Sequence, residues 1–134
     1  MIAIFHAGLA LLAAQASPSE EWHCDNQQTQ IEMNACAAID FDRADTELNA
    51  EYRRTIAWAR DADREERAAG DDRPGDEATL REAQRAWIAF RDAQCRLEGY
   101  EARGGSMEPM LYEGCRARLT RERILQLRPE PLGH

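Results

Sequence analysis

The sequence contains no valine, and no segment in it alternates apolar with polar residues. Both features are expected of amphipathic β-strands, so their absence argues against a sheet. The chain beyond residue 16 is instead rich in Ala, Glu, Arg, Gln and Leu, all of which favour helices. The sequence therefore predicts an all-α protein.

Positive charge is also scarce. Lysine is absent, and 17 Arg side chains stand against 25 Asp and Glu, which gives a formal net charge of −8. Nucleic-acid binding requires clustered basic residues that neutralise phosphates, so this composition argues against a nucleic-acid partner. An acidic surface favours solubility and a cationic partner.

The residues that build catalytic or metal sites are missing in the usual patterns. No two cysteines are closer than twelve positions, whereas zinc and redox sites normally include a close pair. His23 and His134 lie in no ligand or triad spacing, and Gly104-Gly105-Ser106 follows no strand, so it predicts a turn rather than a phosphate site. Asp40, Asp42 and Asp45 are interpreted as a solvated helix face. We expect no catalytic, cofactor-binding or metal site, and no enzyme activity.

Residues 1–16 contain no Asp, Glu, Lys or Arg, but their apolar part is too short to cross a bilayer. Ala14-Gln15-Ala16 is a small-x-small pattern, and turn-forming residues follow it. This arrangement predicts a signal peptide over residues 1–16 and a periplasmic or secreted protein. The residue directly after the predicted cleavage site is Ser17 and not a cysteine, so no lipid anchor is expected at that position and no membrane anchor after cleavage. The alternative is that these residues form a buried N-terminal helix.

The mature chain has four cysteines, Cys24, Cys36, Cys95 and Cys115. An even number in a small exported domain predicts two disulfides, for which three connectivities exist. The pairs Cys24–Cys36 and Cys95–Cys115 are preferred because each encloses a short segment with a turn signal or a helix start, and the crossed pairings stay open. Each bridge is expected to contribute about 3 kcal/mol of stability.

One helical domain is predicted over residues 29–128, after a flexible segment at 17–28 and before a tail at 129–134. Thr29 and Glu32 form a capping box that starts the first helix near Gln30. A break near residues 38–40 is considered, and the charged segment 61–76, with its Gly and Pro cluster, is predicted to be the loop of a helical hairpin. The predicted core stripe of this helix contains Met33, Ala37, Phe41, Ala44, Leu48, Tyr52, Thr55 and Ala59.

A second helix is predicted to begin with Asp76 as N-cap, and a third with Ser106 as its cap. Trp87 and Phe90 are expected to be the main anchors of the second helix. Its predicted core stripe contains Leu80, Ala83, Trp87, Phe90, Gln94 and Leu97, and that of the third helix contains Met110, Leu111, Cys115, Leu119, Ile124 and Leu127. The expected fold is a small antiparallel three-helix bundle, a helical hairpin plus a third helix, stapled by two disulfides.

Polar and aromatic residues gather on neighbouring turns of the second helix, namely Arg85, Trp87, Arg91 and Asp92. The favoured interpretation is that Trp87 packs inside while the charged residues stabilise the bundle or bond to Asp45 or Asn49. The alternative is a binding surface. Asn34 and Asn49, if buried, are expected to bond backbone groups.

These motifs together resemble the LprI-type lysozyme inhibitor family over residues 24–127. The resemblance lies in Thr29 to Ala37, Ala44 to Asn49 with Tyr52, Ala83 to Ile88, Arg91 to Cys95, Gly104 to Ser106, and Leu119-Thr120 with Arg123. It implies a secreted or periplasmic helical domain. Lysozyme inhibition is attributed to one branch of the family, a mycobacterial lipoprotein, from which this sequence differs by lacking a lipobox cysteine and a C-terminal extension.

Two functional hypotheses follow. The first is an acidic binding protein that captures lysozyme or another cationic extracytoplasmic protein by direct contact. If it acts by inserting a loop, residues 61–75 and 103–108 are the two longest polar connections. The second is a structural or adaptor domain of the envelope without inhibitory activity.

Overall fold

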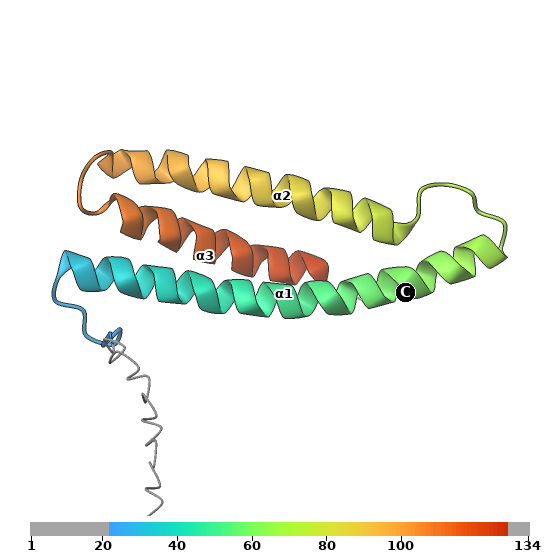
Figure 1. Cartoon of the computed structure of the whole chain (residues 1–134), viewed down its shortest axis with the longest axis horizontal. Coiled ribbons are helices and arrows are strands. Elements are labelled where there is room, and N and C mark those ends of the chain that lie inside the picture. Colours follow the sequence, from blue (N-terminus) through green and yellow to red (C-terminus); the bar gives the residue numbers. More distant parts are fainter. Residues whose placement is uncertain (1–21, 129–134) are drawn as a thin grey trace, which may run out of the picture.

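A computed structural model describes residues 22–128 of the chain. It contains three α-helices, α1 (Gln30–Ala68), α2 (Asp76–Gly99) and α3 (Glu108–Leu127), and a short 3-10 turn, η1 (Tyr100–Ala102). Helices that follow one another in the chain run antiparallel (Figure 1). No strand occurs within residues 22–128. The predicted all-α three-helix bundle is confirmed. The predicted signal peptide at 1–16 and the tail at 129–134 lie outside the described residues.

Helix α1 begins as its capping box predicts. The Thr29 hydroxyl accepts a hydrogen bond from the Glu32 amide, and the Glu32 carboxylate accepts from the amides of Gln28 and Thr29. These backbone bonds, from Gln28 first and then Thr29, lower the pKa of Glu32. The helix continues without a break through residues 38–40 and ends at Ala68, so the hairpin loop is shorter than predicted. The Ala, Glu and Arg residues at 62–68 are strong helix formers, which explains the extension.

Helix α3 packs most extensively against α1. The C-terminal part of α1 extends well beyond the C-terminal end of α3 (Figure 1). The buried core contains Leu48, Ile124 and Leu127, with Tyr52, Leu80 and Trp87 packed around it. The buried positions of α1 include Phe41, Ala44, Leu48, Thr55 and Ala59, which follow the predicted stripe. The Thr55 hydroxyl also donates to the Leu127 carbonyl oxygen at 2.9 Å, which ties the end of α3 to α1.

Helix α2 buries a different face from the predicted one. Its buried residues are Gln84, Arg91, Cys95 and Gly99, whereas Phe90 and Leu97 are 57% and 63% exposed. The predicted anchor Phe90 is therefore wrong, while Trp87 is partly buried against the core. The Cys95 disulfide and the close approach of Gly99 to α3, where an added Cβ would lie 3.5 Å from Glu108, turn this face inward.

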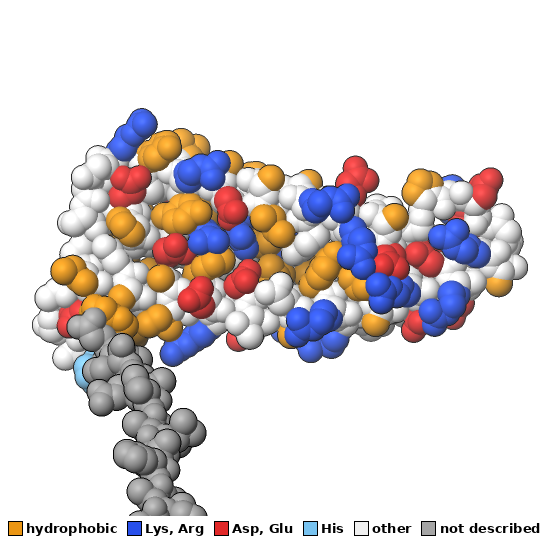
Figure 2. Space-filling model, in the orientation of Figure 1, with side chains coloured by type: hydrophobic (Ala, Val, Ile, Leu, Met, Phe, Trp, Pro, Cys, Tyr) orange, Lys and Arg blue, Asp and Glu red, His pale blue; other side chains and the backbone are white. Residues whose placement is uncertain are grey.

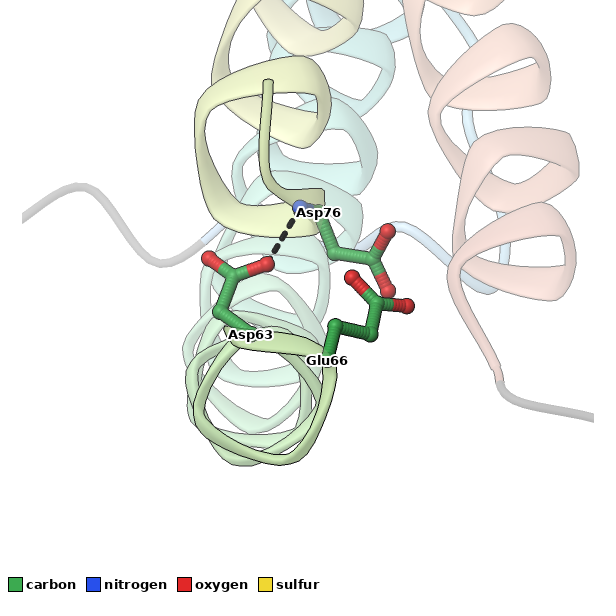
Figure 3. Close-up of side chains that lie close together, drawn as sticks. All are labelled: Asp63, Glu66 and Asp76. Atoms are coloured by element: carbon green, nitrogen blue, oxygen red, sulfur yellow. Dashed lines mark hydrogen bonds between the residues drawn. The ribbon is translucent and has the colours of Figure 1, made fainter. Parts of the chain in front are cut away.

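Both later helices start differently from the sequence prediction. Gly75, not Asp76, is the N-cap of α2, and the missing side-chain cap is replaced by Asp63 of α1. Figure 3 shows the Asp63 carboxylate accepting from the Asp76 amide, at 2.5 Å, and it also accepts from the Glu77 amide at 3.3 Å. Helix α3 begins at Glu108 with Met107 as N-cap and no side-chain cap, so the predicted Ser106 cap is wrong.

The cysteines pair as Cys24–Cys36 and Cys95–Cys115. The first bridge fastens the segment before α1 to the second turn of that helix. The second joins α2 to α3 across the turn that connects them. These are the preferred pairs, and the crossed connectivities are not formed.

The described helices also bear on membrane insertion. None of those between residues 22 and 128 has a stretch apolar enough, over sufficient length, to cross a bilayer.

The cap that Asp63 provides to α2 gives a stability prediction. Asp63→Ala leaves the first amides of α2 without an acceptor, so the free energy of unfolding should fall by about 1 kcal/mol. Denaturant unfolding followed by circular dichroism measures it. Asp61→Ala is the matched control, because Asp61 is exposed and, within residues 22–128, pairs only with Arg64 on its own helix; it should change stability by less than about 0.5 kcal/mol. Equal losses in the two variants would contradict the capping role.

Candidate functional site

Arginine and aromatic side chains from all three helices alternate where the helices meet; Arg91 and Phe41 are buried and the other four are half-buried. The Arg116 guanidinium carbon lies 5.1 Å from the ring centre of Tyr112 and 3.7 Å from that of Phe41. Arg91 follows, 5.1 Å from Phe41 and 5.0 Å from Trp87. Arg123 ends the series, with its guanidinium carbon 5.8 Å from the ring centre of Trp87. We call these six residues the arginine ladder. Guanidinium groups at these distances from aromatic rings are attracted by the ring electrons.

Arg91 is the centre of the ladder and is only 5% exposed. Its Nε donates to the Asp92 carboxylate at 2.9 Å, and its Nη1 lies 3.6 Å from the Asp45 carboxylate and 3.4 Å from the Thr120 hydroxyl. Because a buried charge is costly unless it is paired, this single side chain requires α1, α2 and α3 to keep one relative position.

The neighbouring arginines are held in the same way. Arg116 lies 3.4 Å from the same Asp92 carboxylate and pairs with Glu113 at 3.1 Å. Arg123 donates to the Gln84 side-chain oxygen at 3.0 Å, and burial lowers the pKa of its guanidinium. Most polar groups of the ladder arginines thus pair with neighbouring carboxylate, hydroxyl and amide side chains, while the buried Arg116 Nε has no hydrogen-bond partner within residues 22–128. These contacts fix the helices relative to one another.

The structure separates the polar residues that the sequence grouped on α2. Arg91 and Trp87 belong to the ladder, and Arg91 pairs with Asp92 and faces Asp45 as considered, but Arg85 is exposed. Asn49 is exposed and bonds Asp45 at 3.2 Å. Half-buried Asn34, in contrast, donates to the Ser106 carbonyl oxygen at 2.9 Å, so it fastens the α2–α3 connection to α1. Of the two asparagines, only this one bonds a backbone group across the fold.

The sequence did not show that Arg91 stacks on Phe41 of α1, or that Arg116 and Tyr112 of α3 continue the series from that ring. A signal was present on α3. Tyr112, Arg116 and Arg123 are spaced by four and seven residues, which places them on one face of a helix. The partner ring on α1 could not be inferred, because it depends on how α1 and α2 cross.

The three aspartates near the start of α1 have different surroundings. Asp40 is bound by both terminal nitrogens of Arg121 on α3. Asp45 faces Arg91, and Asp42 is exposed with no ion pair among the described residues. Only Asp42 therefore behaves as a solvated surface group, while the other two join helices. His23 is exposed, and His134 lies outside the described part.

The hairpin end of the bundle is strongly acidic. Residues 61–77, which we call the acidic tip, contain eight carboxylates and three guanidinium groups. The tip projects past the end of α3 (Figure 1). The carboxylates of Asp63, Glu66 and Asp76 come within 4.8 Å of one another there (Figure 3). Since Asp63 is already bonded to the start of α2, capping accounts for its position.

Some tip carboxylates are neutralised and others are not. Glu77 accepts from Arg60 of α1 at 2.9 Å and from Arg81 of α2 at 2.8 Å, and these bonds, Arg60 first, lower its pKa to about 2. The Arg73 guanidinium, with its backbone amide, lowers the pKa of Asp71 to about 2. Glu65, Glu66 and Asp72 are exposed and have no ion pair within residues 22–128. The tip thus keeps free negative charge.

The buried position of Arg91 predicts a large effect of its removal. Arg91→Ala should lower the free energy of unfolding by about 3 kcal/mol, since it removes the cation beside Asp45 and the closer of the two cations beside Asp92, and opens a gap between two rings. Arg85→Ala, on the exposed side of the same helix, should cost less than about 0.5 kcal/mol. Chemical denaturation measures both. If the Arg91 variant were as stable as the Arg85 variant, the ladder would not organise the bundle.

The lowered pKa of Glu77 predicts a dependence on pH. Because its pKa is lower in the folded chain than the ordinary 4.5, its contribution is complete above about pH 4.5 and is lost as the pH falls toward 2. The melting temperature of Glu77→Gln should therefore fall less steeply than that of the wild type over this range. Glu82→Gln is the control, because Glu82 is exposed and unpaired in the described part. Parallel curves for wild type and Glu77→Gln would contradict the prediction.

Comparison with known proteins assigns the family. The sequence model of the family described as "Lysozyme inhibitor LprI" matches residues 23–127. A protein of Rhizobium meliloti (strain 1021), itself named as uncharacterized, is 44% identical over 124 residues, covering 90% of this chain and 89% of the relative. No solved structure is significantly similar. Since the family match includes all four bridged cysteines and the entire arginine ladder, this chain belongs to the LprI family.

Proposed function

We propose that this protein is a periplasmic or secreted inhibitor of lysozyme that acts by protein–protein contact. Membership of the family described as lysozyme inhibitors carries the proposal. The two disulfides support a location outside the cytoplasm, because such bridges persist in oxidising compartments. The net charge of −8 is suited to a cationic partner.

The acidic tip is the contact surface that we favour. It projects from the bundle, and the hairpin loop within it is held by the Asp63 cap and by Glu77, which bridges α1 and α2. A preformed loop loses little conformational freedom on binding, which favours affinity. Its exposed and unpaired Glu65, Glu66 and Asp72 can attract basic side chains of a partner. Charges of this kind speed association and improve selectivity more than they increase affinity.

The first experiment measures inhibition directly. The oxidised protein at micromolar concentration should slow the cleavage of cell walls by a cationic lysozyme at low ionic strength. Added salt should weaken the inhibition, because salt screens attraction between exposed charges. Absence of inhibition at low salt would contradict the proposed function.

A charge-matched pair of variants then tests the contact surface. Glu65→Gln, Glu66→Gln and Asp72→Asn together remove three charges from the tip, and should weaken inhibition about tenfold. Asp25→Asn, Asp42→Asn and Glu47→Gln remove three exposed charges nearer the other end of the bundle, and should weaken it much less. Equal effects of the two triples would mean that only overall charge matters, and would contradict contact through the tip.

A further inference from the structure

The outward side of α2 carries a continuous apolar stripe that the bundle does not use. It consists of Ala83, Ala86, Phe90, Ala93 and Leu97 of α2 and of Tyr100, the first residue of η1, and all six residues are exposed. The three large ones, Phe90, Leu97 and Tyr100, are 57%, 63% and 43% exposed. Hydrophobic side chains lie along this outer edge of α2 (Figure 2). We call these six residues the outer stripe.

The spacing of the outer stripe is that of a helix–helix seam. Its members are separated alternately by three and four residues, the pattern by which one helix packs against another. At about 100° per residue, the stripe lies opposite the face that carries Gln84, Arg91 and Cys95. It is therefore a second apolar face, distinct from the one that builds the bundle. This second face is also why the sequence predicted Phe90 and Leu97 to be core residues.

The order of large and small residues makes the outer stripe complementary to itself. When two copies of α2 run antiparallel around a two-fold axis between Phe90 and Ala93, Phe90 lies opposite Ala93 of the second copy. Leu97 then lies opposite Ala86, and Tyr100 opposite Ala83. Every layer thus combines one large side chain with one alanine. In a two-fold interface each contact occurs twice, so all six layers are filled in the same way.

The charges at the two ends of the stripe agree with this arrangement. Exposed Glu82 precedes the stripe, and exposed Arg103 follows it. The Arg103 guanidinium carbon lies 4.4 Å from the ring centre of Tyr100, which holds this positive charge beside the stripe. In the antiparallel pair, Glu82 of each copy comes near Arg103 of the other. A parallel pair would instead place like charges together.

We propose that the chain forms a two-fold symmetric dimer in which the outer stripes of two α2 helices pack antiparallel. The dimer is independent of lysozyme inhibition, because its surface lies along α2 and does not include Glu65, Glu66 or Asp72. One helix pair gives an interface at the small end of the range for specific complexes. The dimer should therefore be populated at protein concentrations on the order of 100 μM and dissociate on dilution.

Sedimentation equilibrium of the oxidised chain tests the proposal. Leu97→Glu places a charge in two layers and should raise the dimer dissociation constant by about 100-fold. Leu125→Glu is the matched control, because Leu125 on α3 is also 63% exposed but lies outside the stripe; it should change the constant less than about twofold. Circular dichroism melting verifies that both variants fold.

An exchange of two residues tests the register. Phe90→Ala should weaken the dimer by removing the large partner from two layers, and Ala93→Phe should weaken it by placing two phenylalanines in each. The double variant Phe90→Ala/Ala93→Phe restores one large and one small residue in these layers, and should recover most of the wild-type affinity.

Four outcomes would overturn the proposal. A wild-type chain that is monomeric at all concentrations has no such dimer. A dimer that Leu97→Glu leaves unchanged uses another surface. A double variant no tighter than its single variants excludes the antiparallel register. Capture of an apolar helix of another protein by the outer stripe, with the chain itself monomeric, would likewise mean that a different partner occupies it.

Discussion

The position of the Arg91 guanidinium is the constraint on which the rest of this bundle depends. A buried positive charge is tolerated only where carboxylates and aromatic rings replace its water. Asp45 and Phe41 come from α1, Asp92 and Trp87 from α2, and Thr120 from α3. A shift of one helix along another would break several of these contacts together. The arginine thus specifies how the three helices align, which the few aliphatic residues of the core could do only weakly.

The other fastenings lie at the two ends of the bundle. The Cys95–Cys115 bridge and the bond from Asn34 to Ser106 hold the end at which α2 turns into α3. The Asp63 cap holds the opposite end, where α1 turns into α2. Leu48, Ile124 and Leu127 form a small core between them. A small domain with such a core needs covalent and polar support of this kind, and here each support acts on a different contact between elements.

The bundle presents two distinct surfaces around the arginine ladder. The arginines of the ladder contact aromatic rings and carboxylates of the bundle itself, so they hold the helices together. The two surfaces differ in chemistry: the acidic tip has free carboxylates, and the outer stripe of α2 has exposed apolar side chains without charge. The first suits a cationic protein and the second suits another helix.

The sequence by itself determined the three-helix architecture, the start of α1 and the family, because propensity, capping and motif order are local properties. It favoured the disulfide pairs that form but left the crossed pairings open. It did not determine which face of α2 is buried. That helix has two apolar faces, and only the tertiary structure decided between them, through Cys95, the approach of Gly99 to α3 and the burial of Arg91. Capping of α2 by Asp63 was equally hidden, since its donor and acceptor lie 13 residues apart and meet only when the hairpin closes. Local patterns fix elements, whereas contacts between elements decide which of their faces become core and which remain surface.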